Sequence, residues 1–156
     1  MRLNKWYWYK QPVWVWLIFC VFIHPTWANC TTLDDLFAQA ASDANVPLRL
    51  LRAVCWVESN HRANPPLKLD GGTPSYGMCQ VKLKAAKDTG YVGTVMALRN
   101  PDTNIAVAAH YLRLKLEKYG DWKRAVTAYH CGHYNVGMSV INPYVMLVAL
   151  AMAESR

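Results

Sequence analysis

The chain has 156 residues, a length that allows one domain. It carries 17 Lys and Arg residues against 10 Asp and Glu residues, which gives a formal net charge of +7 at pH 7. The sequence contains no Arg-rich run and no basic patch interleaved with aromatic residues, so we exclude a nucleic-acid-binding protein and expect no nucleic-acid partner.

The first 28 residues have the layout of a secretory signal peptide. Three basic residues precede an almost unbroken apolar run at 13–23, which is shorter than the roughly 20 residues that span a membrane. The sequence Thr-Trp-Ala at 26–28 then offers a small-x-small processing site. We therefore predict a leader over residues 1–28, a domain over residues 29–156, and export to the periplasm or cell envelope. The alternative is an uncleaved leader that anchors the domain in the inner membrane.

Removal of the leader changes the charge and the cysteine count. Taking its three basic residues from the 17 leaves 14 against 10 acidic residues, a net charge of +4. This mild basic excess suits an acidic polymer or an envelope surface. In an oxidising compartment the remaining cysteines can form two disulfides in three connectivities, or stay as free buried thiols. They are Cys30, Cys55, Cys79 and Cys131.

Two helices are predicted before residue 61. Thr32 is a suitable N-cap for a helix that runs through about Asp43. A second helix is predicted over residues 46–60, with Asn45 as its N-cap and Pro47 in its first turn. Both segments carry apolar residues at helical spacing.

The segment that follows is rich in residues that interrupt regular structure. Residues 62–75 contain three prolines and two glycines, which predicts a loop. A two-stranded β-ribbon within this loop is the alternative.

The rest of the chain is predicted to form four helices separated by short turns. Asn100 and Asp121 stand as N-caps, and Gly120 and Gly132 stand where two of the helices end. No segment shows the alternation typical of a long strand, so the predicted fold class is mainly α. The predicted ranges are 81–89, 101–119, 122–131 and 143–155.

Glu58 is a carboxylate on the face of its helix that should be buried. Counting back three, four and seven residues gives Cys55, Val54 and Leu51, which are all apolar. A poorly solvated carboxylate has a raised pKa, so we expect Glu58 to donate a proton near neutral pH. The alternative is that Glu58 ends the helix in solvent, because polar residues follow it.

Glu58-Ser59 is followed by four further motifs. Their order and spacing closely resemble the soluble lytic transglycosylase domain, a lysozyme-like fold, over about residues 33–148. The resemblance implies a mainly helical domain with an irregular loop or small β-ribbon between the helix of Glu58 and the Gly-x-x-Gln motif. The motifs are SYGMCQV (75–81), NPDTNI (100–105), AVTAYHCG (125–132) and PYV (143–145).

The resemblance assigns roles to five residues. Glu58 matches the single catalytic acid and base, and Ser59 matches the hydroxyl that holds the glycan or orients the carboxyl group. Gly77 and Gln80 match the motif that lines the cleft, where Gln80 binds sugar groups and Gly77 lets the backbone come close. Tyr129 matches the tyrosine whose hydroxyl reaches toward the catalytic glutamate.

The sequence also departs from the family pattern. His130 stands where the family usually has Asn, and it can still donate one hydrogen bond and accept another. A cationic His130 near Glu58 would lower the pKa of that glutamate. Cys79 and Cys131 stand where the family prefers Met and Ala, and a bridge between them is one hypothesis. We place His130 and the loop residue Tyr76 among the substrate-binding residues.

The resemblance implies a lyase that cleaves the β-1,4 bond between N-acetylmuramic acid and N-acetylglucosamine and leaves a 1,6-anhydro product. Glu58 would protonate the glycosidic oxygen and then deprotonate the C6 hydroxyl of the sugar. Two alternatives are a muramidase that uses water, on the same fold, and a non-catalytic peptidoglycan-binding assembly protein.

No cofactor is expected, and we predict no metal site. His130, Cys131 and His133 lie close in sequence, but their spacing is not a zinc signature. The expected partner is the peptidoglycan glycan strand, bound by a monomer. The small size resembles specialised members of the family that open local gaps for secretion or conjugation machinery, or for phages that enter the cell.

Overall fold

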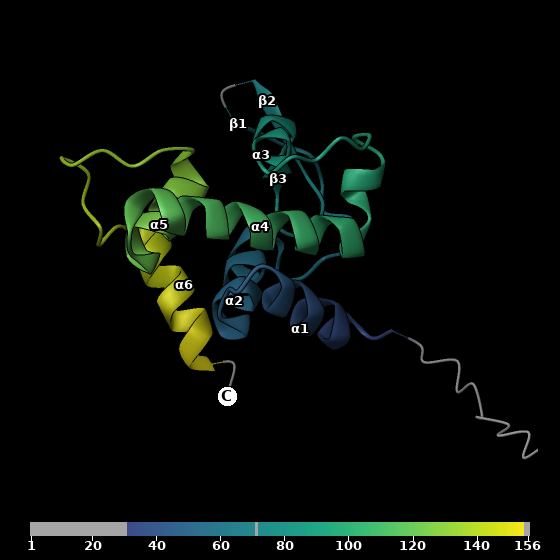
Figure 1. Ribbon diagram of the computed structural model, residues 1–156, viewed down its shortest axis with the longest axis horizontal. Coiled ribbons are helices and arrows are strands. Elements are labelled where there is room, and N and C mark those ends of the chain that lie inside the picture. Colours follow the sequence, from purple (N-terminus) through teal and green to yellow (C-terminus); the bar gives the residue numbers. More distant parts are fainter. Residues whose placement is uncertain (1–30, 71, 155–156) are drawn as a thin grey trace, which may run out of the picture. The chain divides into compact units, whose positions relative to one another are not determined.

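The computed structural model describes residues 31–70 and 72–154 of the chain (Figure 1). The predicted leader, Cys30 and the last residue of the predicted C-terminal helix lie outside these residues. The described part is mainly helical, as predicted, and none of its helices is long and apolar enough to cross a membrane. Its elements are α1 (Leu33–Asp43), α2 (Leu48–Ser59), β1 (Lys68–Asp70), β2 (Thr73–Tyr76), β3 (Val81–Lys82), α3 (Leu83–Asp88), the 3-10 helix η1 (Ala97–Arg99), α4 (Pro101–Tyr119), α5 (Trp122–Cys131) and α6 (Pro143–Glu154).

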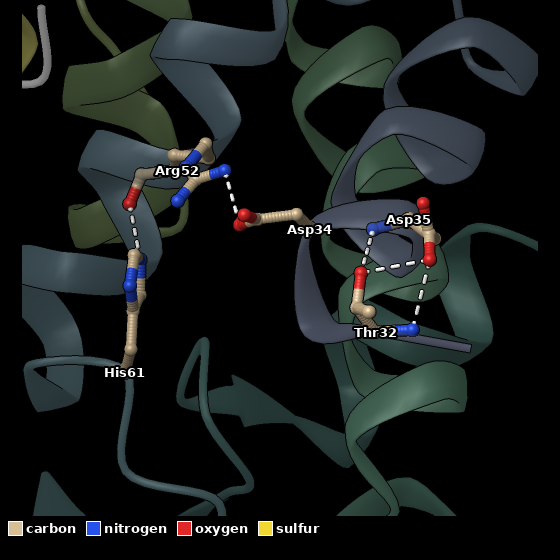
Figure 2. Close-up of polar contacts among 5 residues, drawn as sticks. All are labelled: Thr32, Asp34, Asp35, Arg52 and His61. Atoms are coloured by element: carbon tan, nitrogen blue, oxygen red, sulfur yellow. Dashed lines mark hydrogen bonds and ion pairs between the residues drawn. The ribbon is translucent and has the colours of Figure 1, made fainter. Parts of the chain in front are cut away.

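The predicted caps of three helices are confirmed. Thr32 and Asp35 form a reciprocal capping box at the start of α1 (Figure 2). The Asp35 amide donates to Thr32 Oγ1 over 3.2 Å, and the Thr32 amide donates to the Asp35 carboxylate over 2.9 Å. The side chains of Asn100 and Asp121 accept backbone N–H groups at the starts of α4 and α5. These caps satisfy donors that a helix leaves unpaired at its first turn.

Asn45 does not cap α2, which corrects the prediction. It lies just past the end of α1 with a φ of +51°. The amide of Asn45 donates to the Ser42 carbonyl, and the amide of Val46 donates to the Ala41 carbonyl. These two bonds form a Schellman motif, so Asn45 closes α1. Pro47 occupies the N-cap position of α2 without a side-chain cap.

The segment between α2 and α3 forms a three-stranded antiparallel sheet in the order β1-β2-β3. The β-ribbon, which was the alternative to a plain loop in this segment, is therefore present, and a third strand extends it. The prediction of a helix over 81–89 was wrong at its start. Val81 pairs with Tyr76 in the sheet, and the helix α3 begins two residues later, at Leu83. The turn between β2 and β3 has positive φ at Gly77 (+68°) and Gln80 (+49°). The strand that follows has only two residues, which is too short for the alternation of a strand to be recognised in the sequence.

The core is organised around α4, which contacts α1, α3 and α5, while α2 packs on α6 (Figure 1). One face of α2 is completely buried, so this helix is held firmly against its neighbours. The end of α2 is thereby fixed beside the turn between β2 and β3. Fully buried core side chains include Phe37, Leu51, Val54, Leu98, Ile105 and Leu112.

His61 follows α2, and its ring lies beside the backbone of Arg52 in that helix (Figure 2). Its Nε2 lies 2.9 Å from the Arg52 carbonyl oxygen, which can only accept, so Nε2 carries the proton. Its ring lies 5.0 Å from the Phe37 ring and 5.3 Å from the Trp56 ring, measured between centroids. Burial lowers the pKa of His61, and the hydrogen bond to Arg52 only partly opposes this.

The lowered pKa of His61 predicts a loss of stability in mild acid. The unfolded chain, with an ordinary histidine pKa near 6.5, takes up a proton at higher pH than the folded domain does. The free energy of unfolding should therefore fall as pH drops below about 6.5. Urea unfolding between pH 7.5 and 5 measures this. His61→Asn, which tolerates the left-handed backbone there, should flatten the dependence, whereas the same change at the exposed His110 should not.

Candidate active site

Glu58 lies in the last turn of α2, where the buried face of the helix meets solvent. Leu51, Val54 and Cys55 are fully buried, and Glu58 itself is half-buried. The predicted placement on the buried face is therefore confirmed, although the helix does end one residue later.

Two cavities adjoin at Glu58. The first, here called the α5 cavity, has a volume of about 260 Å³ and includes Tyr111, Tyr129 and His130 in its wall. The second, here called the loop cavity, has a volume of about 490 Å³ and is lined mainly by residues from the end of α2 and the following loop. Glu58 and Gln80 belong to both linings. The carboxylate therefore stands between two halves of one cleft.

Tyr144 holds the carboxylate from α6. Its hydroxyl donates to Glu58 Oε1 over 2.7 Å. Burial, followed by the negative charge of Glu58, raises the pKa of Tyr144 well above its ordinary value. The hydroxyl therefore stays protonated and remains a donor over the physiological range. The sequence motif PYV contains this tyrosine, but no feature of the sequence indicated its partner.

Tyr129 supports the opposite wall of the cleft. The family resemblance predicts that its hydroxyl reaches toward Glu58. In the structure the hydroxyl donates to the carbonyl oxygen of Cys79 over 2.7 Å. Burial is the main cause that raises the pKa of Tyr129, and the charge of Glu58 adds to it. Tyr129 thus lies close to Glu58 while it anchors the chain segment that precedes Gln80.

Gln80 lines both cavities and carries a buried acceptor that no described residue pairs with. Its Nε2 donates to the Gly77 carbonyl over 3.0 Å, which fixes the orientation of the amide. Its Oε1 is buried and has no hydrogen-bond partner among the residues that the structure describes. Buried acceptors of this kind are nearly always satisfied. A bound group with an N–H or O–H donor would complete the site.

Gly77 is required by a neighbour within the protein. Its φ of +68° favours glycine, and a Cβ there would collide with the side-chain amide of Asn104. The sequence predicts that Gly77 lets the backbone come close to a partner in the cleft. The close approach that the structure shows is to Asn104, a residue for which the motifs predicted no role.

The other predicted site residues have different surroundings. Ser59 donates to the Met78 carbonyl over 2.6 Å and so ties the end of α2 to the Gly-x-x-Gln turn. Tyr76 is half-buried in β2 and lines neither cavity. His130 is exposed in the wall of the α5 cavity. The structure therefore brings Glu58, Gln80, Tyr129 and His130 to one cleft, whereas Tyr76 is not part of either cavity lining.

A disulfide joins Cys55 of α2 to Cys79 of the turn. The hypothesis of a Cys79–Cys131 bridge was wrong, because Cys131 is an exposed free thiol in the wall of the α5 cavity. Cys55 lies one helical turn before Glu58, and Cys79 immediately precedes Gln80. The bridge therefore fixes the catalytic candidate against its neighbouring turn.

The Cys55→Ala, Cys79→Ala double variant is predicted to lose about 3 kcal/mol of unfolding free energy, the chain-entropy value for a loop of this size. The bridge closes a loop with a sequence separation of 24. Urea unfolding without reductant measures the change. Cys131→Ser is the matched control and should unfold like the wild type. An unchanged unfolding free energy in the double variant would contradict the prediction.

A family model described as Transglycosylase SLT domain matches residues 35–144. The chain belongs to this family. Among solved structures, it is similar to the lytic transglycosylase Slt of Pseudomonas aeruginosa, in an inactive mutant with glutamate replaced by glutamine, with a TM-score of 0.61 and 17% identity. The match covers 80% of this chain and 24% of that chain, so this chain spans about a quarter of that protein. The comparison with curated proteins found no match.

The SLT match and the structural likeness agree on the lysozyme-like fold. The matched residues 35–144 begin in α1 and end at Tyr144, so they include the first four motifs and the tyrosine of the fifth, whose hydroxyl contacts Glu58. The geometry of the cleft therefore lies within the SLT domain.

Proposed function

We propose that this SLT domain is a peptidoglycan lytic transglycosylase that cleaves the β-1,4 bond between N-acetylmuramic acid and N-acetylglucosamine. The carrying observation is Glu58, which lies between two adjoining cavities and accepts a hydrogen bond from Tyr144. Membership of the SLT family supports a peptidoglycan substrate. The inactivity of the Pseudomonas glutamate-to-glutamine mutant is consistent with an essential glutamate.

Different parts of the cleft would bind different parts of the glycan. The two halves on either side of Glu58 would take the sugars on either side of the cleaved bond. Gln80 lines both halves, and its buried Oε1 would accept an N–H or O–H from a sugar. Binding the glycan in this way satisfies a buried acceptor, which favours substrates with a donor at that position.

Glu58 would act first as an acid and then as a base. The protonated carboxyl group donates its proton to the glycosidic oxygen as the C1–O bond breaks, and the acetamido group stabilises the oxocarbenium-like centre. The ionised carboxylate then removes the proton of the C6 hydroxyl, whose oxygen bonds to C1. Glu58 regains its proton, and the products are a 1,6-anhydro end and a free 4-hydroxyl. No water is consumed.

The proposal assigns both proton transfers to one carboxylate. Ordinary glycosidases divide them between two. Asp88 is exposed at the end of α3. Asp102 is exposed in the first turn of α4, where its negative charge interacts favourably with the helix dipole. Neither residue lines the α5 cavity or the loop cavity.

Analysis of cleaved sugar ends tests the proposed reaction. Purified peptidoglycan is digested with the protein, and the soluble fragments are identified by mass spectrometry. Anhydro-muramic ends support the transglycosylase. Reducing muramic ends would assign the domain to the water-using muramidases. If sacculi sediment with the protein and release nothing, the non-catalytic binding protein is the better assignment.

We also propose that the chain is exported to the periplasm or envelope, where a secretion, conjugation or phage apparatus would recruit it. The leader-like sequence of residues 1–28 motivates this, and the Cys55–Cys79 disulfide agrees with an oxidising compartment. Fractionation of cells that express the full chain, followed by N-terminal sequencing, tests it. A protein found only in the cytosol would contradict the proposal.

A further inference from the structure

His130 and Tyr144 form a face-to-face aromatic pair in the cleft. Their ring centroids are 4.2 Å apart, and the ring planes differ by 15°. His130 comes from the last turn of α5 and is exposed, whereas Tyr144 comes from the first turn of α6 and is buried. The imidazole ring therefore covers one face of the phenol ring on its solvent side.

The position of the Tyr144 ring determines the hydrogen bond to Glu58. The hydroxyl oxygen lies at the end of a rigid side chain with two rotatable bonds, so a tilt of the ring displaces it from Glu58 Oε1. Hydrogen bonds weaken steeply as distance and angle depart from ideal values. A group packed flat on the ring restricts this tilt.

We propose that His130 is a positioning residue that holds the Tyr144 hydroxyl against Glu58 by stacking on the tyrosine ring. The inference rests on the proposed function of Glu58, and it gives His130 a role other than direct contact with the sugar. The asparagine that the family usually carries here has no ring. At this position of the SLT domain, the stacked ring of His130 therefore takes the place of an asparagine side-chain amide.

Titration of Glu58 tests the stack without requiring activity. Carbon-13 NMR of the side-chain carboxyl group gives its titration midpoint in the wild type, Tyr144→Phe, His130→Ala and His130→Phe. Loss of the tyrosine donor destabilises the ionised carboxylate, so the midpoint should rise in Tyr144→Phe and His130→Ala. His130→Phe keeps a flat ring that can stack on Tyr144 and carries no ionisable group, so its midpoint should stay near that of the wild type. Equal shifts in His130→Ala and His130→Phe would assign the effect to charge and overturn the proposal.

Kinetics on purified peptidoglycan give a second, independent readout. His130→Ala should lower kcat by roughly tenfold because the catalytic group is misplaced, with KM nearly unchanged. His130→Phe should restore most of kcat. In a Tyr144→Phe background, His130→Ala should have no further effect, since the hydroxyl that it positions is gone. A raised KM with unchanged kcat, in both His130 variants, would show direct substrate binding and overturn the proposal.

His133→Ala is the matched control. His133 is an exposed histidine three residues further along the chain and is not part of the α5 cavity lining. Its removal should leave the Glu58 titration and kcat unchanged. A wild type that cleaves no peptidoglycan would overturn the proposed function, and the NMR titration would still decide whether His130 acts through Tyr144.

Discussion

Replacement of Glu58 by glutamine is expected to lower glycan cleavage by about a thousandfold or more, the upper range for loss of a general acid and base. Glutamine has nearly the same volume, and its amide oxygen can still accept the hydrogen bond from Tyr144. It cannot donate a proton to the glycosidic oxygen or take one from the C6 hydroxyl. The change therefore removes the proton transfers and leaves the shape of the cleft intact.

Release of soluble fragments from purified peptidoglycan, quantified by mass spectrometry, measures this loss. The variant should unfold at the same temperature as the wild type, because Glu58 is only half-buried and its hydrogen bond is retained. Glu117→Gln is the matched control, since Glu117 is an exposed glutamate of α4 that pairs with Arg113. Cleavage above a tenth of the wild-type rate in Glu58→Gln would refute the role given to Glu58.

The sequence predicted helix starts well because capping is a local interaction. Thr32, Asn100 and Asp121 each accept backbone donors two or three residues away, so the signal and its partner lie in the same short window. The prediction for Asn45 was wrong because this residue lies between two helices and could end the first or cap the second. Asparagine also tolerates a left-handed backbone, and here that property closes α1.

The sequence predicted only part of the site. The motif order placed Glu58, Gln80 and His130 in one cleft because the family resemblance supplied the fold. The partner of each polar group depends on packing between distant segments, which periodicity does not report. Tyr144 meets Glu58 across 86 residues, and the buried Cys55 is indistinguishable in pattern from a core apolar residue.

Asn104 shows the same limit, and its removal is the second large effect that we expect. Its side chain is fully buried at the start of α4 and makes three hydrogen bonds. Its Oδ1 accepts from the Cys79 amide at 2.7 Å, and its Nδ2 donates to the carbonyls of Tyr76 and Leu98, each at 2.9 Å. One amide group therefore holds the turn between β2 and β3 and the segment before α4.

Asn104→Leu should lower the free energy of unfolding by about 3–5 kcal/mol, because one buried donor and two buried acceptors lose their partner. Such a loss is a large fraction of the total stability of a domain of this size. Urea unfolding measures it. Asn104→Asp is the informative partner variant, since it keeps the acceptor for Cys79 but sets a second acceptor against two carbonyl oxygens. It should therefore remain destabilised as well.

The effect of Asn104 should extend to activity beyond the loss of folded protein. The Cys55–Cys79 bridge and the Tyr129 hydrogen bond hold the turn from other sides, so the variant turn stays attached but is less tightly oriented. Gln80 then no longer presents its acceptor at a fixed place beside Glu58. We expect KM for glycan to rise at temperatures where Asn104→Leu is still folded. A variant that is destabilised as predicted but binds glycan like the wild type would show that the bridge and Tyr129 alone orient the turn.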